Sequence, residues 1–325
     1  MNDSSFSKTD SSLDLKLRPR SLDEFVGNAN LIKRLKIMIE AAKLRNEPIH
    51  HILFHGPPGL GKTTLALIIA KEMNVNLITS SGPLIEKPGD LAGILTSLSE
   101  NDVLFIDEIH RLQKNVEEYL YSAMEDFQLD LIIDSGPSAR SVTVALNKFT
   151  LVAATTKTGL LSAPLRTRFT SHLRLEYYER ESLSQIIERS SRLLNVAIDK
   201  KSSLEIAKRS RGTPRIANNL LRWIRDFAQI ESKNKIDLNT VCEACKMIHI
   251  DEEGLDEMDK KILKMIIEHH DGGPVGIKSI AQGIGEEEHT IEEVYEPYLI
   301  MNGFLKRTPR GREVTKLGYS HIGEI

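Results

Sequence analysis

The residues with the clearest chemical potential lie in one glycine-rich segment, Gly56 to Thr63, which fits the pattern GxxxxGK[ST] without mismatch. Gly59 and Gly61 allow backbone N–H groups to face an anion at a helix start, where the helix dipole also favours negative charge. Lys62 is expected to reach the β- and γ-phosphates of a nucleotide, and the Thr63 hydroxyl to hold Mg²⁺. The segment therefore predicts a binding site for a nucleoside triphosphate.

Two carboxylates form a second chemical landmark. Asp107 and Glu108 directly follow the apolar run 103–106. Four consecutive apolar residues are typical of a strand buried on both faces of a parallel sheet, and such sheets bind ligands at the carboxyl ends of their strands. Asp107 is expected to bind Mg²⁺, directly or through water, and Glu108 to orient and polarise the attacking water. The pair predicts hydrolysis as well as binding.

Three further side chains occupy positions where they could assist hydrolysis. Thr156 follows the apolar run 149–154, so its hydroxyl could bond the attacking water or the γ-phosphate, or it could simply end a strand. Arg166 and Arg168 follow a proline and could be solvated, but this position favours an arginine finger in a neighbouring subunit's site. Arg215 projects from a helix start and could touch the phosphates from a lid.

The order of apolar runs and helical periodicities predicts an α/β P-loop NTPase core, a small all-α lid and a C-terminal winged-helix domain. The core strands are expected at 52–54, 76–79, 103–106 and 149–154, with helices at 30–43, 65–70 and 116–126. Two β-rich runs within 128–145 flank a Gly-Pro turn at 135–138 and predict a hairpin. The lid helices are expected at 181–194, 203–211, 214–230 and 238–248, and the last helices at 260–268, 277–284 and 288–301. The domains are then 14–179, 180–252 and 253–325, after a disordered tail, 1–13.

Composition excludes several classes of protein. The chain has 325 residues, of which 40% are hydrophobic and 27% charged, and a formal net charge of −3, so only local patches could bind nucleic acid. No apolar run is long enough for a membrane span, and a cytoplasmic location is expected. Cys242, Cys245 and His249 lie on one helix face, but without a fourth ligand they fit packing better than zinc binding.

The segment 303–312 looks like a β-wing with a basic tip. It offers Lys306, Arg307, Arg310 and Arg312, which are expected to contact DNA phosphates rather than to read bases. The preceding helix, 288–301, carries four glutamates and is a poor candidate for entering a negatively charged groove. A solvated run of charges is the alternative interpretation of the wing.

From about Leu17 to Gly323, the chain resembles the RuvB family, the AAA+ motors of bacterial Holliday-junction branch migration. The resemblance rests on stretches such as HGPPGLGKTTLA, SGPLIEKPGDLA, DVLFIDEIHRL, AMEDFQLD, SAPLRTRF, RGTPRIANNLLR and EPYLIMNGFLKRTPRGR. Generic clamp loaders share motifs like HGPPGLGKTTLA and DVLFIDEIHRL. They lack AMEDFQLD and the terminal TPRGR. These last two stretches make the resemblance specific.

The resemblance implies a set of site residues. Nucleotide contacts are implied at Leu17, Arg18, Gly59, Lys62, Thr63, Thr64, Glu125, Asp126, Phe127, Tyr178 and Arg215. Arg168 matches the finger that acts on a neighbouring subunit, and Arg307 and Arg312 match DNA contacts of the wing. The family further implies a homohexameric ring on duplex arms of Holliday-junction DNA, with ATP and Mg²⁺, in recombination, repair and the SOS response. It implies docking of RuvA on the hairpin 128–145 and RuvC in a larger complex.

A few positions depart from the family's usual pattern. Thr167 and Thr170 stand where Asp and Gly are common, which could alter how the finger segment is held. Glu288 and His289 stand where Arg-Asp is common, which predicts weaker DNA binding. An AAA+ loader or remodeller acting on a protein partner remains the alternative function. A static winged-helix DNA binder with a vestigial P-loop is a third interpretation, which Glu108 disfavours.

Overall fold

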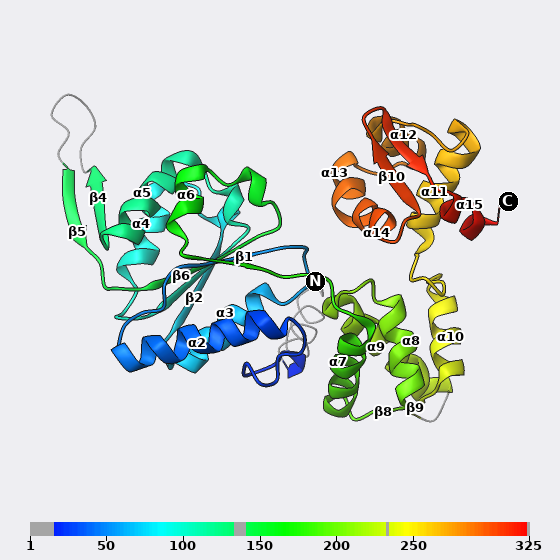
Figure 1. Ribbon diagram of the computed structural model, residues 1–325, viewed down its shortest axis with the longest axis horizontal. Helices are drawn as coiled ribbons and strands as arrows, with labels where there is room; N and C mark the ends of the chain where they lie inside the picture. The colour runs from blue at the N-terminus through cyan, green and yellow to red at the C-terminus, as the bar shows by residue number, and fades with distance from the viewer. Residues whose placement is uncertain (1–15, 133–140, 232–233, 324–325) are drawn as a thin grey trace, which may run out of the picture. The chain divides into compact units, whose positions relative to one another are not determined.

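The computed structural model describes residues 16–132, 141–231 and 234–323. These residues form two compact units (Figure 1). The first unit comprises the chain up to Ile186 together with Thr213–Arg215, and the second comprises Ile187–Gly212 and the chain from Ile216 onward. The predicted tail, 1–13, and the predicted turn, 135–138, lie outside the described residues.

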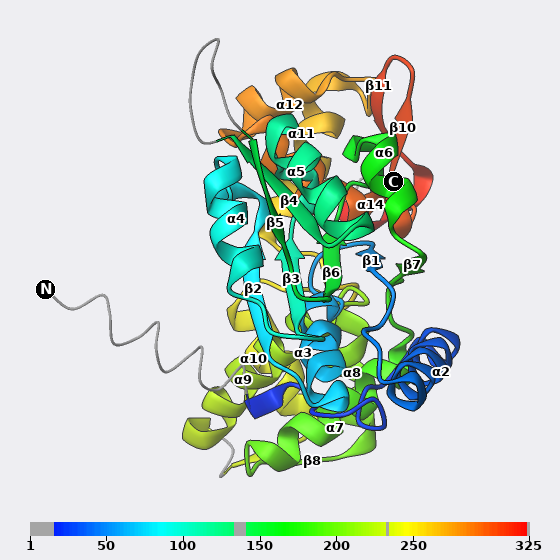
Figure 2. The same cartoon turned by 90° about the vertical axis from the view of Figure 1, so that its left-hand side faces the viewer.

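The first unit is built on a five-stranded parallel sheet with the strand order β2-β3-β6-β1-β7 (Figure 2). The strands are β1 (Ile52–His55), β2 (Leu77–Ser81), β3 (Val103–Asp107), β6 (Thr150–Thr155) and β7 (Ser171–Arg174). The predicted α/β core is confirmed. The sequence did not reveal β7, because this edge strand buries only Leu173 and so lacks an apolar run.

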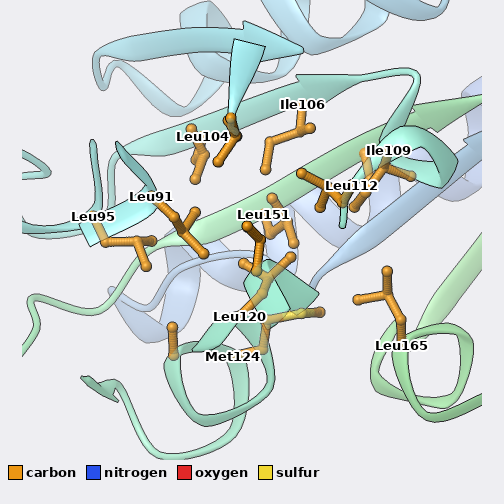
Figure 3. Close-up of a cluster of buried hydrophobic side chains, with 14 of the residues drawn as sticks. Leu91, Leu95, Leu104, Ile106, Ile109, Leu112, Leu120, Met124, Leu151 and Leu165 are labelled. Atoms are coloured by element: carbon orange, nitrogen blue, oxygen red, sulfur yellow. The ribbon is translucent and has the colours of Figure 1, made fainter. Parts of the chain in front are cut away.

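Helices cover both faces of this sheet (Figure 1). On one side lie α2 (Ala29–Arg45) and α3 (Lys62–Met73), and on the other α4 (Pro88–Thr96), α5 (Lys114–Glu125) and α6 (Ala163–Arg168). On the second side, Leu104, Ile106 and Leu151 pack against helix residues such as Leu91 and Leu120 (Figure 3). Each such side chain contributes about 1.5–3 kcal/mol when it is buried.

An antiparallel hairpin follows α5 and interrupts the alternation of strands and helices. Its strands are β4 (Gln128–Ile132) and β5 (Ser141–Ala145), paired from Gln128 opposite Ala145 to Ile132 opposite Ser141. The predicted hairpin is therefore confirmed for its strands. Short 3₁₀ helices occur elsewhere in this unit, at η1 (Gly82–Leu84), η2 (Ile109–Arg111) and η3 (Thr158–Leu160).

The helical segment after the core contains the four predicted helices. They are α7 (Arg180–Leu193), α8 (Lys200–Arg209), α9 (Pro214–Glu231) and α10 (Leu238–Met247). Proline stands at the first position of α9, where its missing N–H leaves no intrahelical bond unmade. A parallel pair, β8 (Ala197–Ile198) and β9 (Lys235–Ile236), joins two of the connections, and strands of two residues are too short to give a periodic pattern.

The C-terminal part has the predicted helices and wing. Its elements are α11 (Glu257–His270), α12 (Ile277–Ile284), α13 (Glu288–Thr290), η4 (Ile291–Tyr295), α14 (Glu296–Met301), β10 (Leu305–Thr308), β11 (Gly311–Val314) and α15 (Lys316–Ile322). The helix predicted at 288–301 is interrupted by a π-turn, η4, just before Pro297. Because proline has no N–H to donate, the regular bonding pattern fails at this place. No described helix is long and apolar enough to cross a membrane.

Candidate functional site

Three neighbouring strands deliver the predicted chemical groups to one edge of the sheet. The P-loop follows β1, Asp107 ends β3 and Thr155 ends β6, and these strands are adjacent in the order β3-β6-β1. Because the strands are parallel, their carboxyl ends lie at the same edge. Gly61 precedes α3 with φ 103°, a left-handed conformation that suits glycine, so the loop turns sharply into the helix.

Lys62 is held inside the P-loop. It is only 6% exposed, and its ammonium group donates hydrogen bonds to the carbonyls of Gly56 at 2.7 Å and Pro57 at 2.8 Å. Burial lowers the pKa of Lys62, while the charges of Asp107 and Glu108 act in the opposite direction. A buried cation beside two carboxylates is thus already positioned for a polyphosphate.

Glu108 lies in a cluster of hydrogen-bonding groups. The Thr156 hydroxyl donates to its carboxylate at 3.2 Å, and Nδ1 of His110 lies 3.3 Å from the same oxygen. His110 in turn contacts the Thr155 hydroxyl at 2.9 Å. Glu108 itself has φ 48°, an uncommon left-handed conformation for a side chain of this size, so the surroundings must hold it there.

His110 was missed by the sequence interpretation. It lies two residues after Glu108, in the short helix η2, and its side chain is nearly buried. The pattern Asp-Glu-x-His could have indicated it, because an imidazole that close to a catalytic carboxylate can orient it. The structure assigns to His110 a link between the ends of β3 and β6.

The arm before α2 contacts the P-loop through Phe25, and the side chains of both Leu17 and Phe25 are buried. The Phe25 ring packs against Gly61, since a Cβ added to this glycine would lie 3.1 Å from the ring. Tyr178 is also buried and donates a hydrogen bond to the Leu60 carbonyl at 3.2 Å. Of the contacts implied by the family, Leu17 and Tyr178 therefore lie in the core of the first unit, and Tyr178 bonds the P-loop directly.

The start of α9 approaches the P-loop from another direction. A Cβ on Gly59 would lie 2.7 Å from Cγ2 of Thr213 and 3.2 Å from Cβ of Arg215. Only glycine fits such a close approach, and its φ of 77° requires glycine as well. Arg215 is exposed at this point, and its charge lowers the pKa of Lys62, whereas the two carboxylates raise it. The structure thus brings the predicted Arg215 to the P-loop.

A second group of predicted nucleotide contacts lies at the opposite edge of the sheet. Phe127 packs edge-on against Phe149 at 5.8 Å between ring centroids, and 6.4 Å from His51. Phe149 and His51 directly precede β6 and β1, whereas the P-loop follows β1. Since strands rise about 3.3 Å per residue, four-residue β1 separates the two edges by roughly 10 Å or more. The structure does not bring Phe127, Glu125 and Asp126 to the P-loop of their own chain.

Arg168 belongs to this same distant edge. α6 ends at Arg168, and β7 then begins at Ser171, which pairs with Ile52 at the start of β1. The guanidinium donates to Glu125 at 3.0 Å and stacks over the Tyr121 ring at 4.4 Å. Arg166, by contrast, is exposed. Arg168 is therefore oriented by α5, far from the P-loop of its own chain.

The wing presents its basic side chains unequally. Arg310 is exposed at the turn between β10 and β11, and Lys306 pairs with Glu313 at 2.6 Å. The exposed Arg307 donates to Glu292 at 2.9 Å. Arg310 and Arg307 thus remain accessible to a phosphate.

Arg312 is placed differently from the other wing arginines. It is 7% exposed and donates two hydrogen bonds to Glu296, at 3.1 and 2.9 Å, and one to Glu292 at 2.7 Å. Glu296 is itself only 3% exposed. Its guanidinium is thus bonded to two carboxylates, and the expected contact of Arg312 with DNA phosphates stays a prediction. This acidic helix, which is a poor candidate for entering a DNA groove, holds the wing through Glu292 and Glu296.

The cysteines lie on α10. Cys242 is exposed and Cys245 is buried, and burial raises the pKa of the Cys245 thiol to about 11. Among the described residues there is no group of three or more His, Cys, Asp or Glu side chains that could hold a metal ion. A thiol with a raised pKa is a poor metal ligand, which agrees with packing as its role.

Models of three domains match the chain in succession. Residues 17–175 match the Holliday junction DNA helicase RuvB P-loop domain, 178–251 the RuvB AAA lid domain, and 252–323 the RuvB C-terminal winged helix domain. The chain belongs to the RuvB family. The family resemblance expected from the sequence is confirmed, as is the expected combination of P-loop core, lid and winged helix.

RuvB proteins of several named organisms match almost the entire chain. The Holliday junction branch migration complex subunit RuvB of Protochlamydia amoebophila is 63% identical over 320 residues, which cover 98% of this chain and 96% of that protein. The corresponding subunit of Flavobacterium psychrophilum is 57% identical over 313 residues, covering 96% and 92%. The solved structure of the Thermotoga maritima RuvB Holliday junction branch migration motor has a TM-score of 0.86 at 52% identity, covering 94% of this chain and 98% of that one.

Proposed function

We propose that this chain is the ATP-hydrolysing motor subunit of a Holliday-junction branch-migration complex. The observation that carries the proposal is the cluster of Lys62, Asp107, Glu108 and Thr156 at one sheet edge of a RuvB-family core. We assign the nucleotide chemistry to residues 14–179, the lid to 180–252 and DNA contact to 253–325.

The residues at the sheet edge divide the work of hydrolysis. Lys62, with the backbone N–H groups of the loop, binds the phosphates, and Glu108 withdraws a proton from the attacking water. Thr156, bonded to Glu108, holds that carboxylate in place. Thr63 and Asp107 are hard oxygen donors of the kind that Mg²⁺ prefers, and the ion would neutralise phosphate charge when bound.

A ring of identical subunits explains the two separated groups of nucleotide contacts. Arg168 lies at the edge opposite its own P-loop, beside Glu125. In a ring, this edge would face the nucleotide of a neighbouring copy, so that each site is completed by two chains. We therefore propose a homohexamer in which Arg168, Glu125, Asp126 and Phe127 act on the neighbour's ATP.

The hairpin and the wing are the proposed contacts with partners. β4 and β5 form a hairpin that follows α5 and is separate from the five-stranded sheet, which suits the docking of RuvA. We place RuvC in a larger complex with RuvA and this chain. The wing would hold duplex arms of the junction through Arg307 and Arg310. Contacts to phosphates carry no sequence information, so the binding should be non-specific and should weaken steeply with salt.

The decisive experiment measures junction movement and ATP turnover together. The purified chain is mixed with RuvA, ATP and a synthetic four-way junction, and separation of labelled arms is followed. We expect ATP-dependent movement that stops with a non-hydrolysable analogue. Normal ATP turnover without movement would contradict the proposal and favour a loader or remodeller of proteins. A chain that hydrolyses no ATP even with RuvA and DNA would favour a static binder.

Two wing variants should separate DNA contact from domain stability. Arg310→Ala is expected to weaken duplex binding and to lower the slope of log affinity against log salt by about 1, because one phosphate contact is lost.

Arg312→Ala is expected to lower the free energy of unfolding of the wing-bearing domain by about 3–5 kcal/mol, since Glu296 is left buried without its cation. Salt-dependent binding and thermal unfolding measure the two effects. An unchanged unfolding temperature in Arg312→Ala would refute the structural role.

A further inference from the structure

One short loop carries residues that contact both the nucleotide site and the winged-helix domain. α8 ends at Arg209 and α9 begins at Pro214, so the loop is 210–213. At its far end, Thr213 and Arg215 lie against Gly59 of the P-loop. Only Gly212 separates Thr213 from Arg211 in the sequence. Very few backbone bonds therefore separate the contact with the P-loop from the side chain of Arg211.

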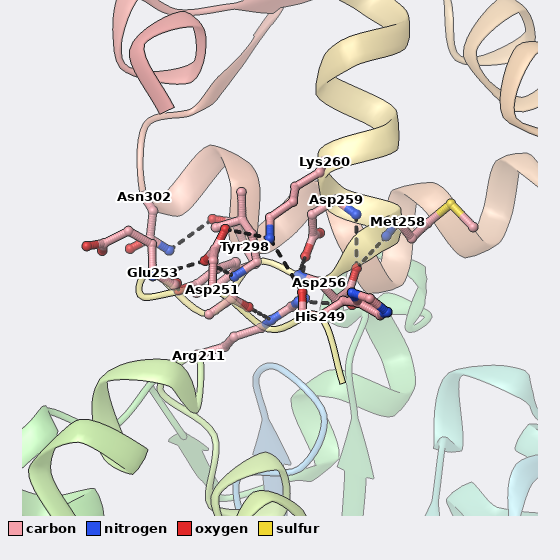
Figure 4. A network of polar contacts seen from close by, with 12 residues as sticks. Arg211, His249, Asp251, Glu253, Asp256, Met258, Asp259, Lys260, Tyr298 and Asn302 are labelled. Carbon is pink, nitrogen blue, oxygen red and sulfur yellow. Dashed lines mark hydrogen bonds and ion pairs between the residues drawn. The ribbon is translucent and has the colours of Figure 1, made fainter. Parts of the chain in front are cut away.

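Arg211 is bound to the winged-helix domain by several different contacts (Figure 4). Its guanidinium donates to the Gly254 carbonyl at 2.8 Å and to Asp256 at 3.0 Å, and it also bonds Asp259. It stacks over the ring of Tyr298 at 4.9 Å. These partners span the linker, the start of α11 and α14, so one side chain holds three parts of the domain.

The partners of Arg211 are themselves fixed in place. Asp256 caps α11, accepting hydrogen bonds from the N–H groups of Met258 and Asp259 at 2.9 Å each. Asp259 is fully buried; burial raises its pKa to about 7, while the charge of Arg211 acts in the opposite direction. The charge of Arg211 thus favours the ionised form of this buried carboxyl group. The Tyr298 hydroxyl donates to the Glu253 carbonyl, which fixes the ring.

The backbone of the loop is also constrained. Arg211 has φ 52° and Gly212 has φ 66°, so two consecutive residues are left-handed. An arginine in this conformation costs free energy that the surrounding contacts must offset. On the other side of the linker, a Cβ on Gly254 would lie 2.7 Å from the Arg209 carbonyl, so the linker packs tightly on the end of α8. A tightly held loop transmits displacement better than a slack one.

We infer that Arg211 is a positioning residue that couples the nucleotide state, sensed at Thr213 and Arg215, to the position of the winged-helix domain. The contacts of Arg211 with Gly254, Asp256 and Asp259 form the coupling clamp. The inference rests on the proposed motor function and adds to it the element that passes the effect of hydrolysis to the DNA-binding domain. Without the clamp, the chain should hydrolyse ATP but move DNA inefficiently.

The test compares junction movement with ATP turnover in the full chain with RuvA and a synthetic four-way junction. Arg211→Ala is expected to keep ATP turnover within about twofold and to lower junction movement per ATP about fivefold or more. Arg211→Lys keeps the charge but loses the planar fork that binds several acceptors. Its junction movement per ATP is therefore expected to lie between that of the unmodified chain and that of Arg211→Ala. Unchanged movement per ATP in Arg211→Ala would overturn the inference.

A double variant distinguishes coupling from folding. Arg211→Ala alone leaves Asp259 buried without its cation, which should lower the unfolding temperature. Adding Asp259→Asn removes that charge and is expected to restore the unfolding temperature, while movement per ATP stays low. Recovery of both quantities together would show that Arg211 only supports the fold and would overturn the inference.

Arg225→Ala is the matched control. Arg225 lies on α9 and pairs with its neighbour Asp226 at 2.7 Å, so its loss removes a lid arginine without touching the clamp. We expect movement per ATP to stay unchanged, and an equal fall in this variant would overturn the inference. A wild-type chain that hydrolyses ATP without moving the junction would instead refute the proposed function, so the two failures are distinguishable.

Discussion

Arg168→Ala is expected to bind ATP normally and to lose turnover by a factor of about 10³ to 10⁵. This loss corresponds to roughly 4–7 kcal/mol of activation free energy. The physical reason is that a finger arginine neutralises charge on the transferred phosphoryl group, and this effect is needed only in the transition state. Since Arg168 lies at the edge opposite its own P-loop, binding of ATP to the same chain should not depend on it.

Mixed rings provide the sharpest test of action on a neighbour. Lys62→Ala subunits, which bind ATP poorly but keep Arg168, are mixed with Arg168→Ala subunits. The mixture is expected to regain part of the turnover, because intact fingers then face sites that still hold ATP. ATP binding and steady-state turnover are measured for each protein and for the mixture. Full turnover in Arg168→Ala alone would rule out the finger.

Arg166→Ala is the matched control for the finger. Arg166 lies on the same short helix, two residues earlier, but is exposed. We expect its loss to reduce turnover far less than the loss of Arg168, which is oriented by Glu125 and Tyr121. Equal losses in the two variants would indicate that both arginines share the role.

Glu108→Gln is expected to retain ATP and to lower turnover by a factor of about 10² to 10⁴, the usual contribution of a general base. Glutamine has the same size and can still accept the hydrogen bond from Thr156, but it cannot take a proton from water. Binding of a fluorescent ATP analogue and single-turnover hydrolysis measure the two effects.

Thr156→Val provides the comparison for that experiment. It removes the hydroxyl that donates to Glu108 while it leaves the carboxylate in place. We expect a smaller loss of turnover than in Glu108→Gln, because the base is misoriented rather than absent. Undiminished hydrolysis in Glu108→Gln would show that another group activates the water. His110 would be the first candidate, because its Nδ1 lies 3.3 Å from the Glu108 carboxylate.

The sequence by itself determined the nucleotide chemistry. Gly56 to Thr63 and the run ending in Asp107 and Glu108 are each contiguous, and their local pattern is sufficient for a phosphate loop and a buried strand. Thr156 could be predicted for the same reason, since it follows an apolar run. The relative order of the strands then brings these groups together, because parallel strands share one carboxyl edge.

Only the tertiary structure decided which charged residues face one another. Arg168 and Arg312 look alike in the sequence, as arginines in short basic segments. One is oriented by Glu125 at the far edge of the sheet, and the other is buried against Glu296 beneath the wing. The sequence could not show which carboxylate holds each arginine, because the partner lies 43 residues away for Arg168 and 16 residues away for Arg312, and an ion pair leaves no periodic pattern. Local backbone preferences specify the P-loop, whereas contacts between distant residues decide which arginines are available to a ligand.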